Sequence, residues 1–263
     1  MTVSPLLLSL NSLADNKNSV IIGQVSGVST DNLNLNIEQI GYNNKVNLKL
    51  AHNSNALLFK QLGNNNEISW VPQWGQQSGG DLDGASNSLH FEQSCTRGSS
   101  CAKSDINMHI YGNSNSVRWG QGMWLNGGVS DTTFANDGDE GGGHTLNLDI
   151  HGSSNSLAGY QRNGNANLYS AHTATVYFYS SSNSFYVVQE TDGTKTASLK
   201  TYNNGNTGSL TQSGSGAHNA AVILNGAYPT TFNLNQQSNS AQSYSLTQNC
   251  QTSGGCSVSV TQN

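Results

Sequence analysis

The chain has 263 residues, of which 34% are apolar and only 10% are charged, and it holds 29 glycines but 3 prolines. Such low charge excludes a conventional disordered chain, which stays unfolded through high charge combined with low hydrophobicity. The net charge of −5 offers no basic surface for nucleic acid, and no apolar run is long enough for membrane insertion.

A seven-residue frame, N-x-h-x-h-x-Q with h mostly apolar, recurs along the chain. Strict alternation places the Asn, both h residues and the Gln on one face of a strand. Two weaker copies carry a glycine, Gly159 or Gly208, at one h position. A repeated strand of this kind buries its apolar face by stacking on its own copies. The copies run over residues 18–24, 55–61, 87–93, 115–121, 155–161, 183–189 and 206–212.

A second alternating segment begins eleven residues before four of these frames, at Ser104, His144, His172 and Lys195. The two segments and the short arcs between them make one coil of about 22 residues, which is a period typical of repeat proteins. The arcs are rich in Gly, Asn and Ser, which accept a positive φ or bond their own backbone. His144 and His172 share a strand-opening position that Ser or Asn would also fill.

These patterns predict an all-β fold, a single β-solenoid domain over residues 1–263 with about ten two-strand coils. At about 4.8 Å for each layer, the rod is about 50 Å long. The stretch 72–86 is degenerate, and its first strand has no clear place. An ordinary β-sandwich is the alternative, but nothing in a sandwich requires Asn and Gln six residues apart this often.

Inward amides are expected to stack into ladders that satisfy their buried hydrogen bonds. Extra residues begin after Gln24, Gln93, Gln121 and Gln161, the longest insertion spans 122–143, and all are expected to lie along one edge. The expected ladder residues are Asn18, Gln24, Gln39, Asn55, Gln61, Asn87, Gln93, Asn115, Gln121, Asn155, Gln161, Asn183, Gln189, Asn206, Gln212 and Gln262.

The four cysteines form two C-x5-C loops, and in an exported protein each loop predicts a disulfide. A zinc site is a poorer interpretation, because neither pair has a second close pair or His partners. The pairs are Cys95 with Cys101 and Cys250 with Cys256.

Oxygen ligands on a glycine-rich loop make Asp137, Asp139 and Glu140 weak Ca²⁺ candidates. The chain lacks the glycine-aspartate nonapeptide repeat of calcium β-rolls, so a solvated loop is the simpler interpretation and no metal or cofactor is expected. No histidine joins a nucleophile and a carboxylate in a recognisable motif, so we expect no catalytic residues and no enzyme. Asp149 and His151 share a strand parity that alternation alone explains. Trp119 has the inward parity of the core.

The run L-N-I-E-Q-I-G-Y-N-N-K-V at 35–46 resembles the curlin repeat, roughly S-x-h-x-h-x-Q-x-G-x-x-N-x-A-x-x-x-Q. Q-x-G recurs at Gln39, Gln61 and Gln212, and the resemblance covers most of the chain in broken form. The cysteines and long loops are additions to the family pattern. The resemblance implies a subunit of curli-type extracellular amyloid fibres, secreted across the outer membrane and stacked end to end in biofilm matrix and adhesion.

The expected function is therefore a structural fibre subunit at the bacterial cell surface or in the biofilm matrix. Its partners would be copies of itself, with a nucleator subunit and an outer-membrane secretion pore. The start of the sequence lacks a basic n-region, so we read it as mature protein with any export signal removed. The expected polymer interface is apolar at both ends of the stack, at Leu6, Leu8, Leu10, Val258, Val260 and Gln262.

A monomeric solenoid that acts as an adhesin or binds polysaccharide or ice is the alternative function. Regular threonine ranks would favour ice, but the outward positions are mixed, as Lys60, His90 and Arg118 illustrate. A β-helical lyase or hydrolase would need clustered carboxylates with basic residues in a groove, and it fits the thinly spread charges worst.

Overall fold

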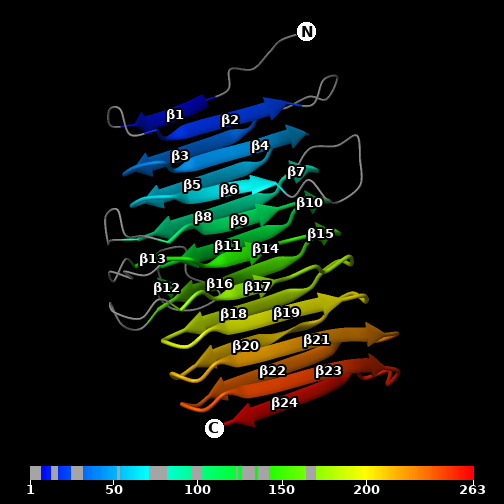
Figure 1. Cartoon of the computed structure of the whole chain (residues 1–263). Coiled ribbons are helices and arrows are strands. Elements are labelled where there is room, and N and C mark those ends of the chain that lie inside the picture. The colour runs from blue at the N-terminus through cyan, green and yellow to red at the C-terminus, as the bar shows by residue number, and fades with distance from the viewer. Residues whose placement is uncertain are drawn as a thin grey trace.

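The computed structural model describes residues 7–12, 17–24, 32–51, 54–70, 82–95, 102–122, 124–125, 134–135, 142–163 and 170–263. Every secondary-structure element within those ranges is a β-strand. The strands stack into an elongated rod of two facing parallel sheets, with β1 and β24 at opposite ends (Figure 1). The predicted all-β solenoid is confirmed. None of the described elements is a helix long and apolar enough to cross a membrane.

The first sheet, sheet A, has ten strands that are all parallel to their neighbours. Each strand is one level, or rung, of the stack, and equivalent frame positions lie in register: Gln61 pairs with Gln93, and Phe59 with Phe91. The strands are β1 (Leu7–Ser12), β3 (Asn34–Ile40), β5 (Ala56–Leu62), β8 (Ser88–Ser94), β11 (Ser116–Gln121), β16 (Ser156–Arg162), β18 (Ser184–Glu190), β20 (Thr207–Ser213), β22 (Thr230–Gln237) and β24 (Cys256–Gln262).

The second sheet, sheet B, has twelve strands, and they run opposite to those of sheet A (Figure 1). Three pairs share a rung (β6 with β7, β9 with β10, β14 with β15), so twelve strands make nine rungs. A separate antiparallel pair joins β12 (Trp124–Leu125) to β13 (Phe134–Ala135). The strands are β2 (Ser19–Gln24), β4 (Lys45–Ala51), β6 (Asn66–Trp70), β7 (Leu82–Asp83), β9 (Ser104–Met108), β10 (Ile110–Tyr111), β14 (Thr145–Asn147), β15 (Ile150–His151), β17 (Thr173–Thr175), β19 (Lys195–Thr201), β21 (His218–Gly226) and β23 (Gln242–Cys250).

The degenerate stretch 72–86 contains β7, which completes the rung that β6 begins, because both strands pair with β4. Residues 71–81, which lie outside the described ranges, separate these two strands in the sequence. Three of the four predicted insertions follow a sheet A strand (β8, β11 or β16) and so begin at one edge. The fourth prediction is wrong, since the insertion after Gln24 follows β2, a sheet B strand, and begins at the opposite edge.

The arcs depend on left-handed backbone, as their composition predicted. The residue before each strand-opening position has a positive φ in coil after coil, for example Asn43 at 57°, Ser54 at 59° and Ser114 at 58°. Gly112, with φ of 124°, also needs its missing side chain, because a Cβ there would lie 2.2 Å from the Gly152 carbonyl oxygen of the next coil. The arcs of neighbouring coils thus stack as closely as the strands do.

A thin apolar core fills the space between the sheets. The Phe59 and Phe91 rings stack with centroids 5.6 Å apart, and Trp119 is fully buried as predicted. Gly159 is explained by this packing, since a Cβ there would lie 2.6 Å from Trp119 Cζ3. The weakened frame copy at 155–161 therefore accommodates the largest core side chain.

Candidate functional site

A continuous glutamine ladder runs along sheet A. Each Nε2 donates to the Oε1 of the next glutamine toward the C-terminal end, at 2.8 Å from Gln39 to Gln61 and 2.8 Å from Gln236 to Gln262. All interior members are buried. The ladder consists of Gln39, Gln61, Gln93, Gln121, Gln161, Gln189, Gln212, Gln236 and Gln262.

The second Nε2 proton of each glutamine crosses to the start of a sheet B strand. Gln61 donates to the Lys45 carbonyl at 3.0 Å, and Gln189 donates to the Thr173 carbonyl at 2.9 Å. The amides are thereby satisfied in the core and also link the two sheets at one corner. Because every donor points the same way, the ladder has a direction along the rod.

An asparagine ladder opens the strands of sheet A. The Oδ1 of Asn87 accepts both the backbone N–H of Asn115, at 2.9 Å, and its Nδ2, at 3.1 Å. The same contacts repeat through Asn155, Asn183 and Asn206, and the series ends where the Thr230 N–H donates to Asn206 Oδ1 at 2.8 Å. These predicted ladder residues are placed as expected.

The first frame copy, Asn18 to Gln24, belongs to sheet B. Asn18 Oδ1 accepts the Asn44 backbone N–H at 2.9 Å, so Asn18 starts an asparagine series of that sheet. Gln24 is in register with Leu50 in sheet B and not with a glutamine of sheet A, so its predicted place on stacked glutamines is wrong. Both strands of a coil alternate with the same period, so the frame alone does not identify the sheet.

In later coils of sheet B, histidine replaces asparagine as the side chain that accepts the backbone N–H of the strand-opening residue in the next coil. His144 Nδ1 accepts the His172 N–H at 3.3 Å, and His172 Nδ1 accepts the Lys195 N–H at 3.2 Å. The two rings stack with centroids 4.9 Å apart. His172 Nε2 lies 3.1 Å from the Arg162 carbonyl, which assigns the proton to Nε2. The predicted equivalence of His with Ser or Asn at this position is confirmed.

Lys195 continues this series and is fully buried. Its ammonium donates to four backbone carbonyls, those of Asp192 at 2.5 Å, Gly193 at 2.9 Å, Gly214 at 2.7 Å and Gly216 at 2.9 Å. Burial lowers the pKa of Lys195 to about 8. The side chain fastens the arcs of two neighbouring coils. The sequence signal for this buried lysine is its place in the alternating pattern, because Lys195 has the same parity as the inward Ala197 and Leu199.

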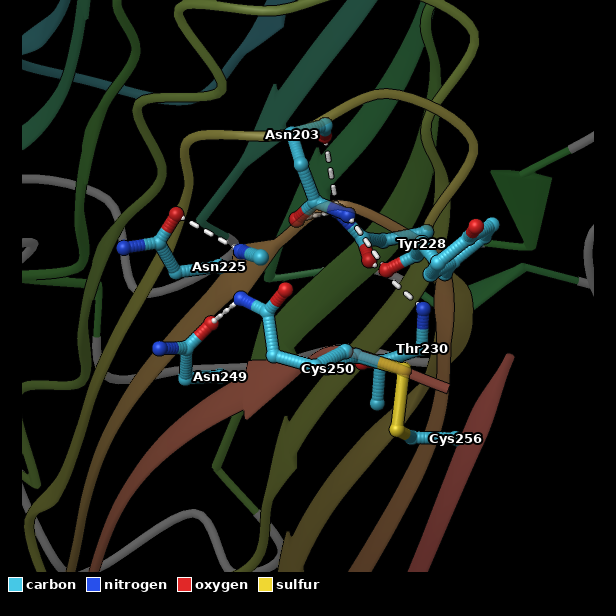
Figure 2. Close-up of a disulfide and its surroundings, with 10 residues drawn as sticks. Asn203, Asn225, Tyr228, Thr230, Asn249, Cys250 and Cys256 are labelled. Atoms are coloured by element: carbon cyan, nitrogen blue, oxygen red, sulfur yellow. Dashed lines mark hydrogen bonds between the residues drawn. A yellow bond between two sulfur atoms is a disulfide. The ribbon is translucent and has the colours of Figure 1, made fainter. Parts of the chain in front are cut away.

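One predicted disulfide joins Cys250 to Cys256, with Cα atoms 5.7 Å apart. Figure 2 shows it beside Tyr228 and Thr230, where it closes the arc between β23 and β24. Cys95 is buried and disulfide-bonded. Cys101 lies outside the described residues, as do the Ca²⁺ candidates Asp137, Asp139 and Glu140.

The two ends of the stack carry unpaired strand edges within the described part of the chain. There, β24 pairs with β22 and β1 pairs with β3, and neither has a partner on its other edge. Leu8 and Leu10 are in register with Leu35 and Ile37, whereas Leu6 lies outside the described residues. The hydrophobic side chains that pack on the main core while only partly buried all lie in the end strands: Val20, Ile22, Tyr244, Leu246, Val258 and Val260.

Titratable side chains gather at a different place, on the outer face of sheet B. His109, Asp149 and His151 have ligand atoms within 4.8 Å of one another. Alternation along one strand explains the shared parity of Asp149 and His151 but does not connect them with His109, which lies forty residues before Asp149. The frames that begin at Asn115 and Asn155 are also 40 residues apart, so this coil spacing was the sequence signal that His109 and Asp149 lie at the same position of neighbouring coils.

No family model, curated protein or solved structure matches this chain. The curlin resemblance therefore remains an interpretation of the repeat. The arrangement itself offers stacked amides, stacked apolar columns and open strand edges, which are features of assembly by strand pairing.

Proposed function

We propose that the protein is a structural subunit of an extracellular, curli-like amyloid fibre that grows end to end by β-strand stacking in biofilm matrix and adhesion. The observation that carries this proposal is that the core columns run the whole length of the rod and end on partly buried side chains at open strand edges. A second copy in the same orientation would pair the open edge of β24 with β1 and cover the partly buried Val258 and Val260.

The joint is specified by the register of sheet A. Strand β24 occupies the position before a following β1, in the same parallel direction. Continuing this register pairs Val258 with Leu8 and Val260 with Leu10 of the next copy. Gln262 would face Ser12, with its Nε2 on the donor end of the ladder. The two apolar contacts across the joint thus repeat the columns inside the rod, whereas Gln262 would meet Ser12 in place of a glutamine.

The sequences of the end strands favour addition. Natural proteins protect open edges with charges, proline or bulges. Neither β24, CSVSVTQ, nor β1, LLSLNS, has a charged residue or a proline. These edges are therefore suited to β-augmentation.

Sheet B imposes one further condition on the joint. Sheet A has ten rungs and sheet B has nine, so a joint that continues sheet A leaves space for one more strand in sheet B. A fibre of this chain alone has to supply that strand from outside the described residues. A second kind of subunit, such as a nucleator, is the other source.

Val260→Lys tests the proposed interface. Lysine at this inward position would place a charge in the apolar column of the joint, so we expect filament growth to stop. The matched control is Thr261→Lys, which adds the same charge to the same strand at an exposed, outward position. We expect this control to form filaments. Equal growth of both variants would refute the interface, and persistent monomers of the unmodified chain would favour the adhesin alternative.

A further inference from the structure

Three titratable side chains meet where the strands of sheet B break. His109 lies between β9 and β10, and Asp149 directly precedes β15, which ends with His151. Ile110 is in register with Ile150, so His109 lies one coil away from Asp149 on the same outward column. The Ile150 backbone N–H donates to the His109 carbonyl at 3.0 Å, which fixes the two coils together at this point.

The next coil is bent at the same level. Tyr177, Phe178 and Tyr179 all have positive φ, at 117°, 74° and 47°. Such backbone is strained for residues other than glycine, and it occurs where surrounding structure imposes it, often at functional sites. The bend brings the Tyr179 hydroxyl to Asp149 Oδ2, to which it donates a hydrogen bond at 2.6 Å. Three successive coils thus contribute to one cluster.

Asp149 is only 3% exposed, although it is a carboxylate on the outer face of a sheet. Its other oxygen, Oδ1, lies 2.5 Å from His151 Nε2 and 3.7 Å from His109 Nδ1. Neither Asp149 Oδ1 nor His151 Nε2 makes a hydrogen bond within the described residues, despite full burial of both atoms. Tyr179 satisfies Oδ2 alone, so Oδ1 is a buried carboxylate oxygen without a hydrogen bond, a costly arrangement that a coordinated metal ion would offset.

Tyr179 has the properties of a residue that orients a metal ligand. Its hydroxyl donates to Asp149 Oδ2 and so holds the carboxylate in one orientation, with Oδ1 turned toward the two histidines. The His151 ring packs against Tyr179, with centroids 4.7 Å apart. Metal-binding carboxylates and imidazoles are characteristically held by such outer hydrogen bonds and packing.

We propose that His109, Asp149 and His151 bind a borderline divalent transition-metal ion, for which Zn²⁺ is the best fit. The donors are His109 Nδ1, His151 Nε2 and Asp149 Oδ1. Two imidazole nitrogens with one carboxylate oxygen suit Zn²⁺, whereas Ca²⁺ and Mg²⁺ prefer oxygen ligands alone.

Bonds of about 2.0–2.2 Å in tetrahedral geometry require donors about 3.3 Å apart. The separations of 2.5 and 3.7 Å from Asp149 Oδ1 bracket this value, so small side-chain rotations suffice. Three protein ligands leave the fourth position for water or an external donor. The bound ion would hold together coils whose strands β10 and β15 are each only two residues long.

The test is titration of the tag-free, chelator-treated chain with Zn²⁺ by isothermal calorimetry, with Co²⁺ absorption spectroscopy as a second readout. We expect one ion for each chain and a Co²⁺ spectrum of nitrogen and oxygen ligands in tetrahedral geometry. His151→Ala should abolish both. Tyr179→Phe should weaken binding about tenfold without changing the stoichiometry, because it removes an orienting contact and no ligand.

His90→Ala is the matched control. His90 Nε2 lies 2.7 Å from Glu92 Oε1 on sheet A, which makes it a histidine–carboxylate pair without a third ligand nearby among the described residues. We expect its removal to leave Zn²⁺ binding unchanged. The proposal is overturned if the unmodified chain shows no saturable binding at micromolar Zn²⁺, or if His151→Ala binds as the unmodified chain does. In either case the cluster is an ion pair and not a metal site.

Discussion

Gln262 accepts a hydrogen bond from Gln236 at 2.8 Å and lies on the open edge of sheet A. The last amide of the ladder is therefore bonded on one side and open on the other. From Gln61 to Gln236, every glutamine of the ladder has a glutamine neighbour on both sides, as Gln161 has in Gln121 at 3.0 Å and Gln189 at 2.8 Å. This difference between an interior and an end position is the basis of the proposed fibre.

The hydrogen bonds of the glutamine ladder should stabilise the fold, and replacing Gln236 tests this. This residue bonds Gln212, Gln262 and the Asn219 carbonyl. Gln236→Leu leaves buried donors and acceptors unsatisfied, so we expect a loss of about 1–3 kcal/mol in the free energy of unfolding. Denaturant unfolding measures it. Gln237→Leu, at the adjacent exposed position, should change stability by less than about 0.5 kcal/mol. Similar losses in both variants would contradict a role for the ladder.

Gly159 should not tolerate a side chain. A Cβ there would lie 2.1 Å from the Val187 carbonyl oxygen and 2.6 Å from Trp119 Cζ3. Gly159→Ala should therefore destabilise the fold by about 1–3 kcal/mol through overpacking. Thermal unfolding checks the sign. The double variant Gly159→Ala, Trp119→Leu should recover part of the loss, and no recovery would show that the backbone contact alone is responsible.

Lys195 should make stability depend on alkaline pH. Its folded pKa of about 8 lies below the ordinary 10.5, so between these values the unfolded chain binds more protons than the folded chain. Stability from this group therefore rises as the pH rises from about 8 to 10.5, and it is constant below 8. Lys195→Met should remove this slope from the pH profile of unfolding. Lys200→Met, at a half-buried position over the Tyr177 ring, should retain it.

The Cys250–Cys256 disulfide should hold the last coil in place. Closing so short a loop contributes on the order of 2–3 kcal/mol by the chain-entropy estimate, and the effect is local. Cys250→Ser should speed hydrogen exchange in β24 more than in β22, and should slow filament growth because β24 forms the joint. Cys256→Ser provides the matched variant and should give the same result. Unchanged exchange in β24 would show that pairing with β22 suffices.

Much of the fold could be predicted from sequence, because stacking makes each coil obey the same local rules. The glutamine ladder followed from the spacing of Asn and Gln, and the substitution of His144 and His172 followed from their shared position. The sheet of Asn18 to Gln24 could not be predicted, since strands of both sheets alternate with the same period.

The cluster of His109, Asp149 and His151 was missed for a different physical reason. Alternation describes regular strands, whereas these residues lie where strands break and where Phe178 adopts a φ of 74°. The open ends were anticipated from the apolar termini of the repeat. The difference between ten rungs in sheet A and nine in sheet B required the register of each strand.

The most direct measurement is electron microscopy of the purified, tag-free chain after quiescent incubation, with diffraction from any filaments. We expect unbranched filaments with a meridional repeat of about 4.7 Å, the spacing of strands stacked along a fibre axis. Rods that remain monomeric even in concentrated solution would contradict the proposed fibre. They would direct attention to the outer faces of the solenoid as ligand-binding surfaces.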